Sequence, residues 1–319
     1  MELDIFEEVR TARTIGISGH QKPDGDCIGA CLGLALYLQK RMPKATVEVF
    51  LQKPGVAFDT IPAIDRIITD FPKRDVFDVF IALDTTPDRM GEANTYFEQA
   101  RNTINIDHHY SNLIGGGQVN YIDATASATS ELIYEVIDHS YLDAEIATNL
   151  YMGIAHDTGV FRYSNTAVKT MQTVAELMKF GFDFPKLLDD TFYGKTYVQN
   201  LIQGRIVLES RRYLDGQLII GSAERKLMKE YGATKDDFDG VVNQLRITQG
   251  VECAIFIYEK EAGVYKASLR ASSDAVNVAV IAEQFLGGGH IRAAGCEFNS
   301  NLRETEERFV ALVQQQLMK

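Results

Sequence analysis

A recurring order of segments in the first 160 residues constrains the fold more than any other feature. A short apolar run is followed by a loop of charged or glycine residues and then by an amphipathic stretch, such as residues 28–38. The apolar runs occupy residues 14–18, 46–50, 76–83, 103–106 and 119–122. Strands that alternate with helices predict a mainly parallel, doubly wound α/β sheet. In such a sheet, ligands bind beyond the carboxyl ends of the strands.

The rest of the chain predicts two further parts. Helical patterns cover residues 127–139, 143–157, 166–180 and about 185–212, and strand patterns return after Gly216. These later strands lie at 217–221, 251–258, 264–270 and 295–298, with helices at 276–285 and 302–317. We therefore expect an α/β domain over 1–184, a helical connector over 185–213 and a smaller α/β domain over 214–319. A chain of 319 residues is long enough for two cores.

The net charge of −12 argues against binding of long duplex nucleic acid, which needs a broad basic face. A small phosphorylated substrate needs only local positive charge, so this class stays open. The acidic start of the chain is unlike a signal peptide, and the apolar stretches are shorter than a membrane span. Four cysteines without a framework spacing fit a reducing compartment. We expect a cytoplasmic protein without a membrane partner.

The loop that follows the first apolar run carries three metal-ligand types close together. Asp24 and Asp26 flank Gly25, so both carboxylates can turn toward one point, and His20 precedes them by four residues. A solvated turn with an aspartate at the helix N-cap explains this loop equally well when it is considered alone.

Three further clusters favour a functional site over that simpler explanation. Asp84 ends an apolar run, Asp107-His108-His109 follows another, and Asp157 ends a helical stretch. A lone histidine or aspartate at any of these places is more often a cap. Four such clusters, three of them at strand ends of one sheet, are hard to attribute to capping.

The residue types in these clusters indicate the chemistry. Carboxylates with a minority of imidazoles and no thiolate suit Mn²⁺ or Mg²⁺ over a structural zinc, and we interpret Cys27 and Cys31 as small core residues. Two such ions about 3.5–4 Å apart can share a bridging carboxylate and a water that attacks phosphorus. Converging carboxylates without a cation would repel one another. The pattern therefore predicts two-metal hydrolysis of phosphate esters.

The chain resembles a known family along nearly its whole length. With Asp107-His108-His109 and the clusters around it, the chain resembles the DHH phosphoesterase superfamily. Gly287-Gly288-Gly289-His290, the following Ala293-Ala294-Gly295 and residues 242–252 are similar to that superfamily's DHH-associated C-terminal domain. The resemblance is strongest to the compact two-domain branch of NrnA-type bifunctional oligoribonucleases and pAp phosphatases.

The resemblance implies two Mn²⁺ ions, with Mg²⁺ or Co²⁺ as alternatives, and a catalytic pair of His109 and Asp84. His109 would face the scissile phosphate, and Asp84 would bridge the ions. Departures from the family pattern are Ala30, where relatives usually carry serine, and Ile291-Arg292 after the glycines; none of them removes a ligand. The implied metal ligands are His20, Asp24 and Asp84 around one ion, and Asp26, Asp84, His108 and Asp157 around the other.

Substrate contacts are expected on both domains. Arginine suits phosphate oxygens, and successive glycine N–H groups can form an anion nest. A surface ion pair for Arg246 and Arg270, and a plain strand connection for the glycines, stay open as alternatives, and His156 is left out of the site. The expected contact residues are Arg89, Asn112, Arg246, Arg270, Gly288, Gly289, His290 and Arg292.

These features lead to one favoured function and two alternatives. The favoured function is hydrolysis of short RNA to mononucleotides and dephosphorylation of 3′-phosphoadenosine 5′-phosphate. The alternatives are a phosphodiesterase for cyclic or linear dinucleotides, and a regulator without catalysis, which would lack a metal ligand. The expected partner is a short RNA or small nucleotide, and a homodimer stays open.

Overall fold

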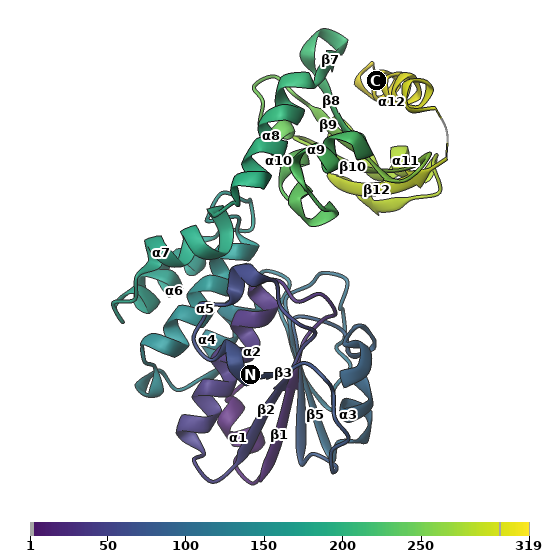
Figure 1. Cartoon of the computed structure of the whole chain (residues 1–319). Helices are drawn as coiled ribbons and strands as arrows, with labels where there is room; N and C mark the ends of the chain where they lie inside the picture. Colours follow the sequence, from purple (N-terminus) through teal and green to yellow (C-terminus); the bar gives the residue numbers. More distant parts are fainter. Residues whose placement is uncertain (1–2, 300, 319) are drawn as a thin grey trace. The chain divides into compact units, whose positions relative to one another are not determined.

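The computed structural model describes residues 3–299 and 301–318. The chain divides into two compact units, residues 1–194 and residues 195–319, which we describe separately (Figure 1).

The first unit contains a six-stranded sheet in the order β3-β2-β1-β4-β5-β6, and every neighbouring pair is parallel. The prediction of a doubly wound, mainly parallel sheet is therefore confirmed. The strands are β1 (Thr14–Ser18), β2 (Thr46–Phe50), β3 (Ile67–Ile68), β4 (Val79–Leu83), β5 (Asn102–Asp107) and β6 (Val119–Ile122).

Both faces of this sheet are covered, as the alternation of β4 shows. Its residues 79, 81 and 83 belong to the large core beneath the helices, while Phe80 and Ala82 belong to an aromatic cluster that includes Phe97 of α3. Successive strand residues point to opposite faces, so a continuous apolar run fits a sheet with two covers. The helices of this unit are α1 (Ile5–Val9), α2 (Gly25–Arg41), α3 (Asn94–Gln99), α4 (Thr129–Val136), α5 (Ala144–Asp157), α6 (Val168–Met178) and α7 (Phe184–Leu188).

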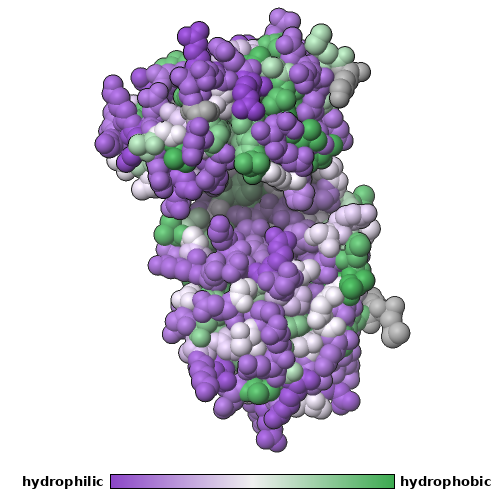
Figure 2. All heavy atoms as spheres, turned by 90° about the vertical axis from the view of Figure 1, so that its right-hand side faces the viewer, coloured by the Kyte–Doolittle hydropathy of each residue, from purple (hydrophilic) through white to green (hydrophobic). Residues whose placement is uncertain are grey.

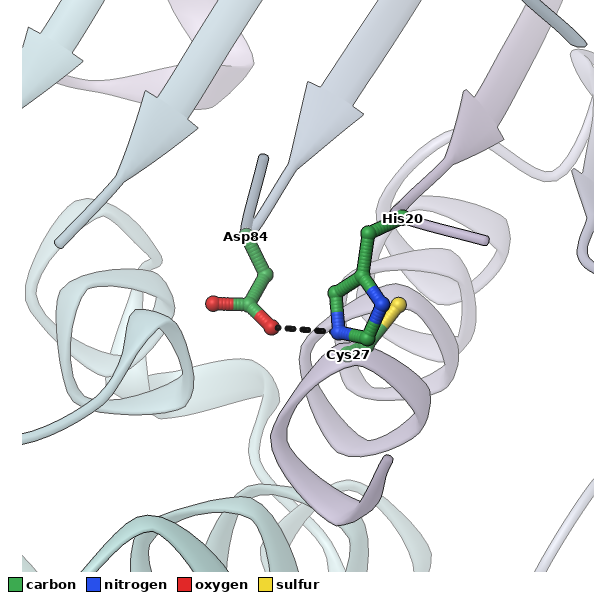
Figure 3. Close-up of side chains that lie close together, drawn as sticks. All are labelled: His20, Cys27 and Asp84. Carbon is green, nitrogen blue, oxygen red and sulfur yellow. Dashed lines mark ion pairs between the residues drawn. The ribbon is translucent and has the colours of Figure 1, made fainter. Parts of the chain in front are cut away.

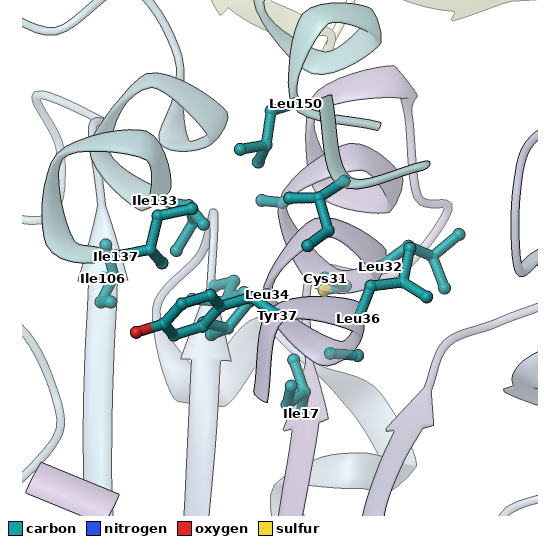
Figure 4. Packing of buried hydrophobic residues seen from close by; sticks show 14 of the residues in the cluster. Ile17, Cys31, Leu32, Leu34, Leu36, Tyr37, Ile106, Ile133, Ile137 and Leu150 are labelled. Atoms are coloured by element: carbon teal, nitrogen blue, oxygen red, sulfur yellow. The ribbon is translucent and has the colours of Figure 1, made fainter. Parts of the chain in front are cut away.

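Helix α2 lies at the centre of the large core, where Leu34 and Tyr37 pack near Ile133 of α4 (Figure 4). Cys27 and Cys31 are fully buried in this core, as the sequence predicts. A Cβ atom on Gly29 would lie 2.4 Å from the carbonyl oxygen of Asn149, so α2 and α5 are nearly in backbone contact. This close packing brings the end of α5 to the start of α2.

The helical stretch expected over about 185–212 is interrupted after residue 193. Helix α7 passes into a π-helical turn, Asp189–Tyr193, and a new helix, α8 (Tyr197–Glu209), begins after it. The Thr196 hydroxyl accepts from the backbone N–H of Gln199, and the Gln199 side-chain oxygen accepts from the backbone N–H of Thr196, so a capping box starts α8. The predicted connector is thus divided between the units, and Ile202 and Ile206 of α8 are buried in the second one.

The second unit contains a mixed sheet in the order β11-β12-β10-β9-β8-β7, in which only β8 and β9 are parallel. Residues 253, 255 and 257 of β9 face one core and Ala254 and Phe256 face another, so helices cover both sides. The strands are β7 (Arg211–Tyr213), β8 (Leu218–Ala223), β9 (Cys253–Glu261), β10 (Val264–Ala271), β11 (Gly288–His290) and β12 (Ala293–Phe298). The helices are α9 (Arg225–Tyr231), α10 (Val241–Arg246), α11 (Val278–Glu283) and α12 (Leu302–Leu317).

The surface drawn in Figure 2 is largely hydrophilic, with apolar residues in small separate areas. None of the helices in the described part of the chain combines the length and the hydropathy of a transmembrane segment.

Candidate metal centre

The clusters picked out in the sequence meet at the carboxyl-terminal edge of the parallel sheet. His20 follows β1, Asp84 follows β4, and His108 follows β5. The start of α2 brings Asp24 and Asp26 to the same place, and the end of α5 brings Asp157. Parallel strands end at one edge, so residues that are far apart in sequence converge there.

One group of side chains consists of His20, Asp24 and Asp84. The Nε2 atom of His20 lies 3.4 Å from Oδ2 of Asp84 and 3.6 Å from Oδ1 of Asp24 (Figure 3 shows the first pair). Asp24 is also the N-cap of α2, because its Oδ1 accepts from the backbone N–H groups of Asp26 and Cys27. The capping bonds fix the position of this carboxylate.

A second group consists of Asp26, His108 and Asp157. The Nε2 atom of His108 lies 3.2 Å from Oδ2 of Asp157 and 3.9 Å from Oδ2 of Asp26. These ligand-type atoms lie within 4.8 Å of one another. The spacing suits one cation between them.

Asp84 lies between the two groups and faces each with a different oxygen. Its Oδ2 faces His20, while its Oδ1 lies 3.6 Å from Nε2 of His108 and accepts a 3.0 Å hydrogen bond from the hydroxyl of Thr129. Asp84 has a backbone φ of +59°, in the left-handed region that non-glycine residues avoid. Strained backbone of this kind collects at functional sites. This position is the one that a bridging carboxylate requires.

The electrostatics of the centre favour bound cations. Burial, followed by the negative charge of Asp26, raises the pKa of Asp84 to about 8 and that of Asp157 to about 9. Burial alone would lower the pKa of the His20 imidazole, but hydrogen bonds to Asp24 and Asp84 outweigh it and raise this pKa to about 11. The carboxylates are therefore crowded with negative charge, which divalent cations would offset.

The donor set suits oxygen-preferring ions. Cys27 also lies beside His20 and Asp84 (Figure 3), and its Sγ is close enough to share an ion with them. Burial raises the pKa of this thiol well above its ordinary range, so it is protonated. The available ligands are thus carboxylates and imidazoles, the set that fits Mn²⁺ or Mg²⁺.

His109 is oriented by a chain of hydrogen bonds beneath it. Its Nδ1 lies 2.7 Å from Oδ1 of the buried Asp107, and the other oxygen of Asp107 accepts a 2.8 Å bond from the Asn112 amide. The same amide donates to Oδ1 of Asn105. The bond to Asp107 raises the pKa of His109 to about 9, with burial opposing it, and leaves Nε2 as the nitrogen turned away from Asp107.

Asn112 and Arg89, the two expected substrate contacts of the first unit, both take part in hydrogen bonds within the protein. Asn112 is 4% exposed and its amide is engaged with Asp107 and Asn105, which favours a role in holding Asp107 over substrate contact. Arg89 lies in the short helical turn Pro87–Arg89, and its carbonyl accepts from the backbone N–H of Gln21, beside His20.

The sequence reasoning missed several residues that hold the centre together. The backbone N–H groups of Thr129 and Ser130 donate to Asp26 at 2.6 Å and 2.9 Å. The ring of His156 packs under the loop, where a Cβ atom on Gly25 would lie 2.2 Å from its Cγ. The small residues at the start of α4 were the available signal for the bonds that Thr129 and Ser130 donate to Asp26. Nothing local in the sequence marks the second contact.

The expected substrate residues of the second unit lie around β11 and β10. Gly288, Gly289 and His290 form the exposed strand β11. His290 and Arg270 both pair with Ala293, on either side of β12, so they occupy one row of the sheet. Arg246 ends α10, and Arg292 forms a 2.8 Å ion pair with Asp274.

Comparison with known families identifies both units. Residues 14–154 match the model of the DHH family, N-terminal domain, and residues 216–319 match the DHHA1 domain.

Individual relatives and structures agree with these matches. The chain is 29% identical over 309 residues to the bifunctional oligoribonuclease and PAP phosphatase NrnA of Thermus thermophilus, covering 95% of this chain and 90% of that protein. It is 24% identical to the cyclic-di-AMP phosphodiesterase PdeA of Listeria monocytogenes, over 96% of this chain but 48% of that protein. The crystal structure of an exopolyphosphatase-related protein from Bacteroides fragilis has the same fold, with a TM-score of 0.86 and 23% identity over 98% of this chain and 95% of that one.

Proposed function

The chain belongs to the DHH family and is a metal-dependent phosphoesterase, and on this premise we propose that it hydrolyses short oligoribonucleotides to mononucleotides and removes phosphate from 3′-phosphoadenosine 5′-phosphate. The observation that carries this proposal is the position of Asp84, whose two oxygens face the His20 group and the His108 group separately. The NrnA relative, matched over 95% of this chain, supports the choice of substrates.

Two divalent cations, which we propose to be Mn²⁺, would supply an activated water and offset the charge that develops on the phosphoryl oxygens. His20, Asp24 and Asp84 would hold one of them. Asp26, Asp84, His108 and Asp157 would hold the other.

The protein's own part in the reaction centres on His109. Asp107 holds the imidazole through Nδ1, so Nε2 can donate to a phosphoryl oxygen of the substrate. The hydrogen bond to Asp107 favours the positively charged form of the His109 ring, which would stabilise negative charge on the phosphoryl oxygens in the transition state. Asn112 keeps Asp107 in place from the opposite side.

We also propose that the second unit binds the substrate beyond the reacting phosphate. Arg246, Arg270, His290 and the glycines of β11 supply the arginine forks and backbone N–H groups that suit a nucleotide. Arg270→Ala should raise KM for a trinucleotide about tenfold and leave Mn²⁺ affinity unchanged. Arg303, an exposed arginine that pairs with Glu307, is the matched variant; an equal effect of Arg303→Ala would show that general charge is responsible.

A substrate panel tests the proposed reaction. Purified chain with Mn²⁺ is incubated with RNAs of two to five nucleotides, with 3′-phosphoadenosine 5′-phosphate and with cyclic di-AMP, and kcat/KM is compared. We expect the short RNAs and 3′-phosphoadenosine 5′-phosphate to be cleaved, and Asp84→Ala to abolish both activities. Failure to cleave either substrate would contradict the proposal.

A dinucleotide phosphodiesterase is the second candidate, because the PdeA relative also matches 96% of this chain. A preference of a hundredfold or more for cyclic di-AMP or its linear product would favour it. The chain spans about half of that relative's length, which ranks this function below the first.

A further inference from the structure

A cavity of about 350 Å³ lies on the first unit at the end opposite to the metal centre. It is bounded by α1, by the residues that precede β1, and by the turn that joins α2 to β2. His20 follows the carboxyl end of β1 and Arg13 precedes its amino end, so five strand residues separate the two places. At about 3.3 Å per residue, that length is about 17 Å. One phosphate cannot occupy both sites.

The charged side chains that line this cavity are basic, whereas the whole chain has a net charge of −12. Among the described residues that line it, the charged ones are Arg10, Arg13, Arg41 and Lys44, all basic, although the chain has 44 acidic and 32 basic residues. Arg10 pairs with Glu7 at 3.0 Å, but both side chains are 59% exposed, so the pair is weak. Within residues 3–299 and 301–318, Arg13 and Lys44 form no ion pair. The charged side chains that line the cavity are therefore basic, while Asp78 accepts from the backbone N–H of Arg13 beside it.

Arg41 is held rigidly at the wall of the cavity. Its guanidinium carbon lies 4.2 Å from the centroid of the Phe6 ring and 4.5 Å from that of Tyr141, and it donates to the Tyr141 hydroxyl. The Nε atom of Arg41 is buried and has no hydrogen-bond partner in the described part of the chain. An arginine fixed between two rings is already oriented for a planar or anionic ligand.

The remaining wall is apolar. Phe6, Met42 and Pro43 line it together with Ala12 and Ala45. A cavity that combines four cations with an aromatic ring suits a ligand that carries both phosphate and a ring. Its volume of about 350 Å³ is at the small end of the range for ligand pockets, about 300–1,000 Å³, which fits a mononucleotide.

We propose that this cavity is a second, non-catalytic binding site for a nucleoside 5′-phosphate. Arg13, Arg41 and Lys44 bind the phosphate, and the base lies against the apolar wall that includes Phe6. The ligand would contact the start of β1 and the end of α2, whose other ends carry His20, Asp24 and Asp26. The site does not depend on the substrate proposed above.

Calorimetric titration of the full chain in EDTA tests the proposal without any turnover. We expect 5′-AMP to bind at this site at least tenfold more tightly than adenosine or inorganic phosphate, because the site uses both parts of the ligand. Arg13→Glu/Lys44→Glu should weaken 5′-AMP at least tenfold. Lys73→Glu/Lys235→Glu, an equal charge change at exposed positions, should leave it unchanged.

Circular dichroism and Tm measurements establish whether each variant folds. If Arg13→Glu/Lys44→Glu does not fold, Arg13→Gln/Lys44→Gln takes its place. Photolabelling with 8-azido-AMP should mark the peptides that contain Phe6 or Met42. Equal binding of 5′-AMP by the parent and both cavity variants would overturn the proposal. The proposal would also be overturned if inorganic phosphate bound as tightly as 5′-AMP. It would be overturned as well if a 20-nucleotide RNA displaced 5′-AMP and the cavity variants weakened that RNA equally. Because no activity is measured, these outcomes are independent of the proposed reaction.

Discussion

The carboxylate of Asp26, at the start of α2, accepts a 2.6 Å hydrogen bond from the backbone N–H of Thr129, at the start of α4. Its other oxygen accepts from Ser130 at 2.9 Å. The N-cap position of α4 is Ala128, which has no side-chain acceptor, so Asp26 caps this helix from 103 residues away. One proposed metal ligand is thereby oriented before any cation binds, and the first turn of α4 becomes part of the metal centre.

Replacing Asp84 should separate stability from activity. In EDTA, Asp84→Asn should stabilise the chain by about 1–3 kcal/mol, because it removes the cost of burying an ionisable carboxyl group next to Asp26 and keeps an acceptor for Thr129. The same variant should lose phosphoesterase activity. Thermal denaturation checks the first outcome, and a lower Tm for the variant in EDTA would contradict it.

The stability of the metal-free chain should fall as the pH rises. The folded-state pKa values of Asp84 and Asp157, about 8 and about 9, lie above the ordinary value of 3.8, so the folded chain binds more protons than the unfolded chain between these values. Their stabilising contribution is complete below about pH 4 and is lost by about pH 9. A Tm series in EDTA measures the slope. Mn²⁺ should flatten it, because cations then replace the protons.

Asn112 should act through His109. Asn112→Ala removes the amide that holds Asp107, so we expect kcat to fall about tenfold with little change in KM. His109→Ala should cost more, and the double variant should be no slower than His109→Ala alone. Additive losses in this double-mutant cycle would assign Asn112 a separate role.

The contact between Gly25 and His156 predicts a compensating pair. Gly25→Ala places a methyl group against the His156 ring, which Phe58 and Phe192 confine, and so should displace the loop that carries Asp24 and Asp26. We expect a loss of activity and of Mn²⁺ affinity. His156→Ala creates space and should restore at least part of both to the Gly25→Ala chain. No recovery in the double variant would show that the glycine is needed for another reason.

Glu131 should stabilise the first turn of α4 and the residues that precede it. This buried carboxylate accepts from the backbone N–H and the hydroxyl of Ser127 and from the hydroxyl of Thr170. Glu131→Ala leaves these donors without a partner and should cost about 2–4 kcal/mol of unfolding free energy. Glu145→Ala, at an exposed position of α5, is the control and should change stability by less than about 0.5 kcal/mol. Urea denaturation compares the two.

The strands and the polar residues at their ends could be predicted from local sequence. The apolar runs before His20, Asp84 and His108 are each followed by a loop, and the parallel sheet brings those loops to one edge. The break before α8 also had a local signal, the Thr196–Gln199 capping box, which the helical periodicity obscured.

The sequence by itself therefore determined the parallel sheet and the residue types at its carboxyl edge, since periodicity and strand ends are local properties. Only the tertiary structure decided that Asp26 caps α4, that Asn112 supports His109 through Asp107, and that His156 lies against Gly25. These are contacts between side chains and backbone groups of separate elements, or between side chains in a shared loop network. Their geometry depends on how closely α2, α4 and α5 pack, and no local pattern in the sequence encodes that spacing.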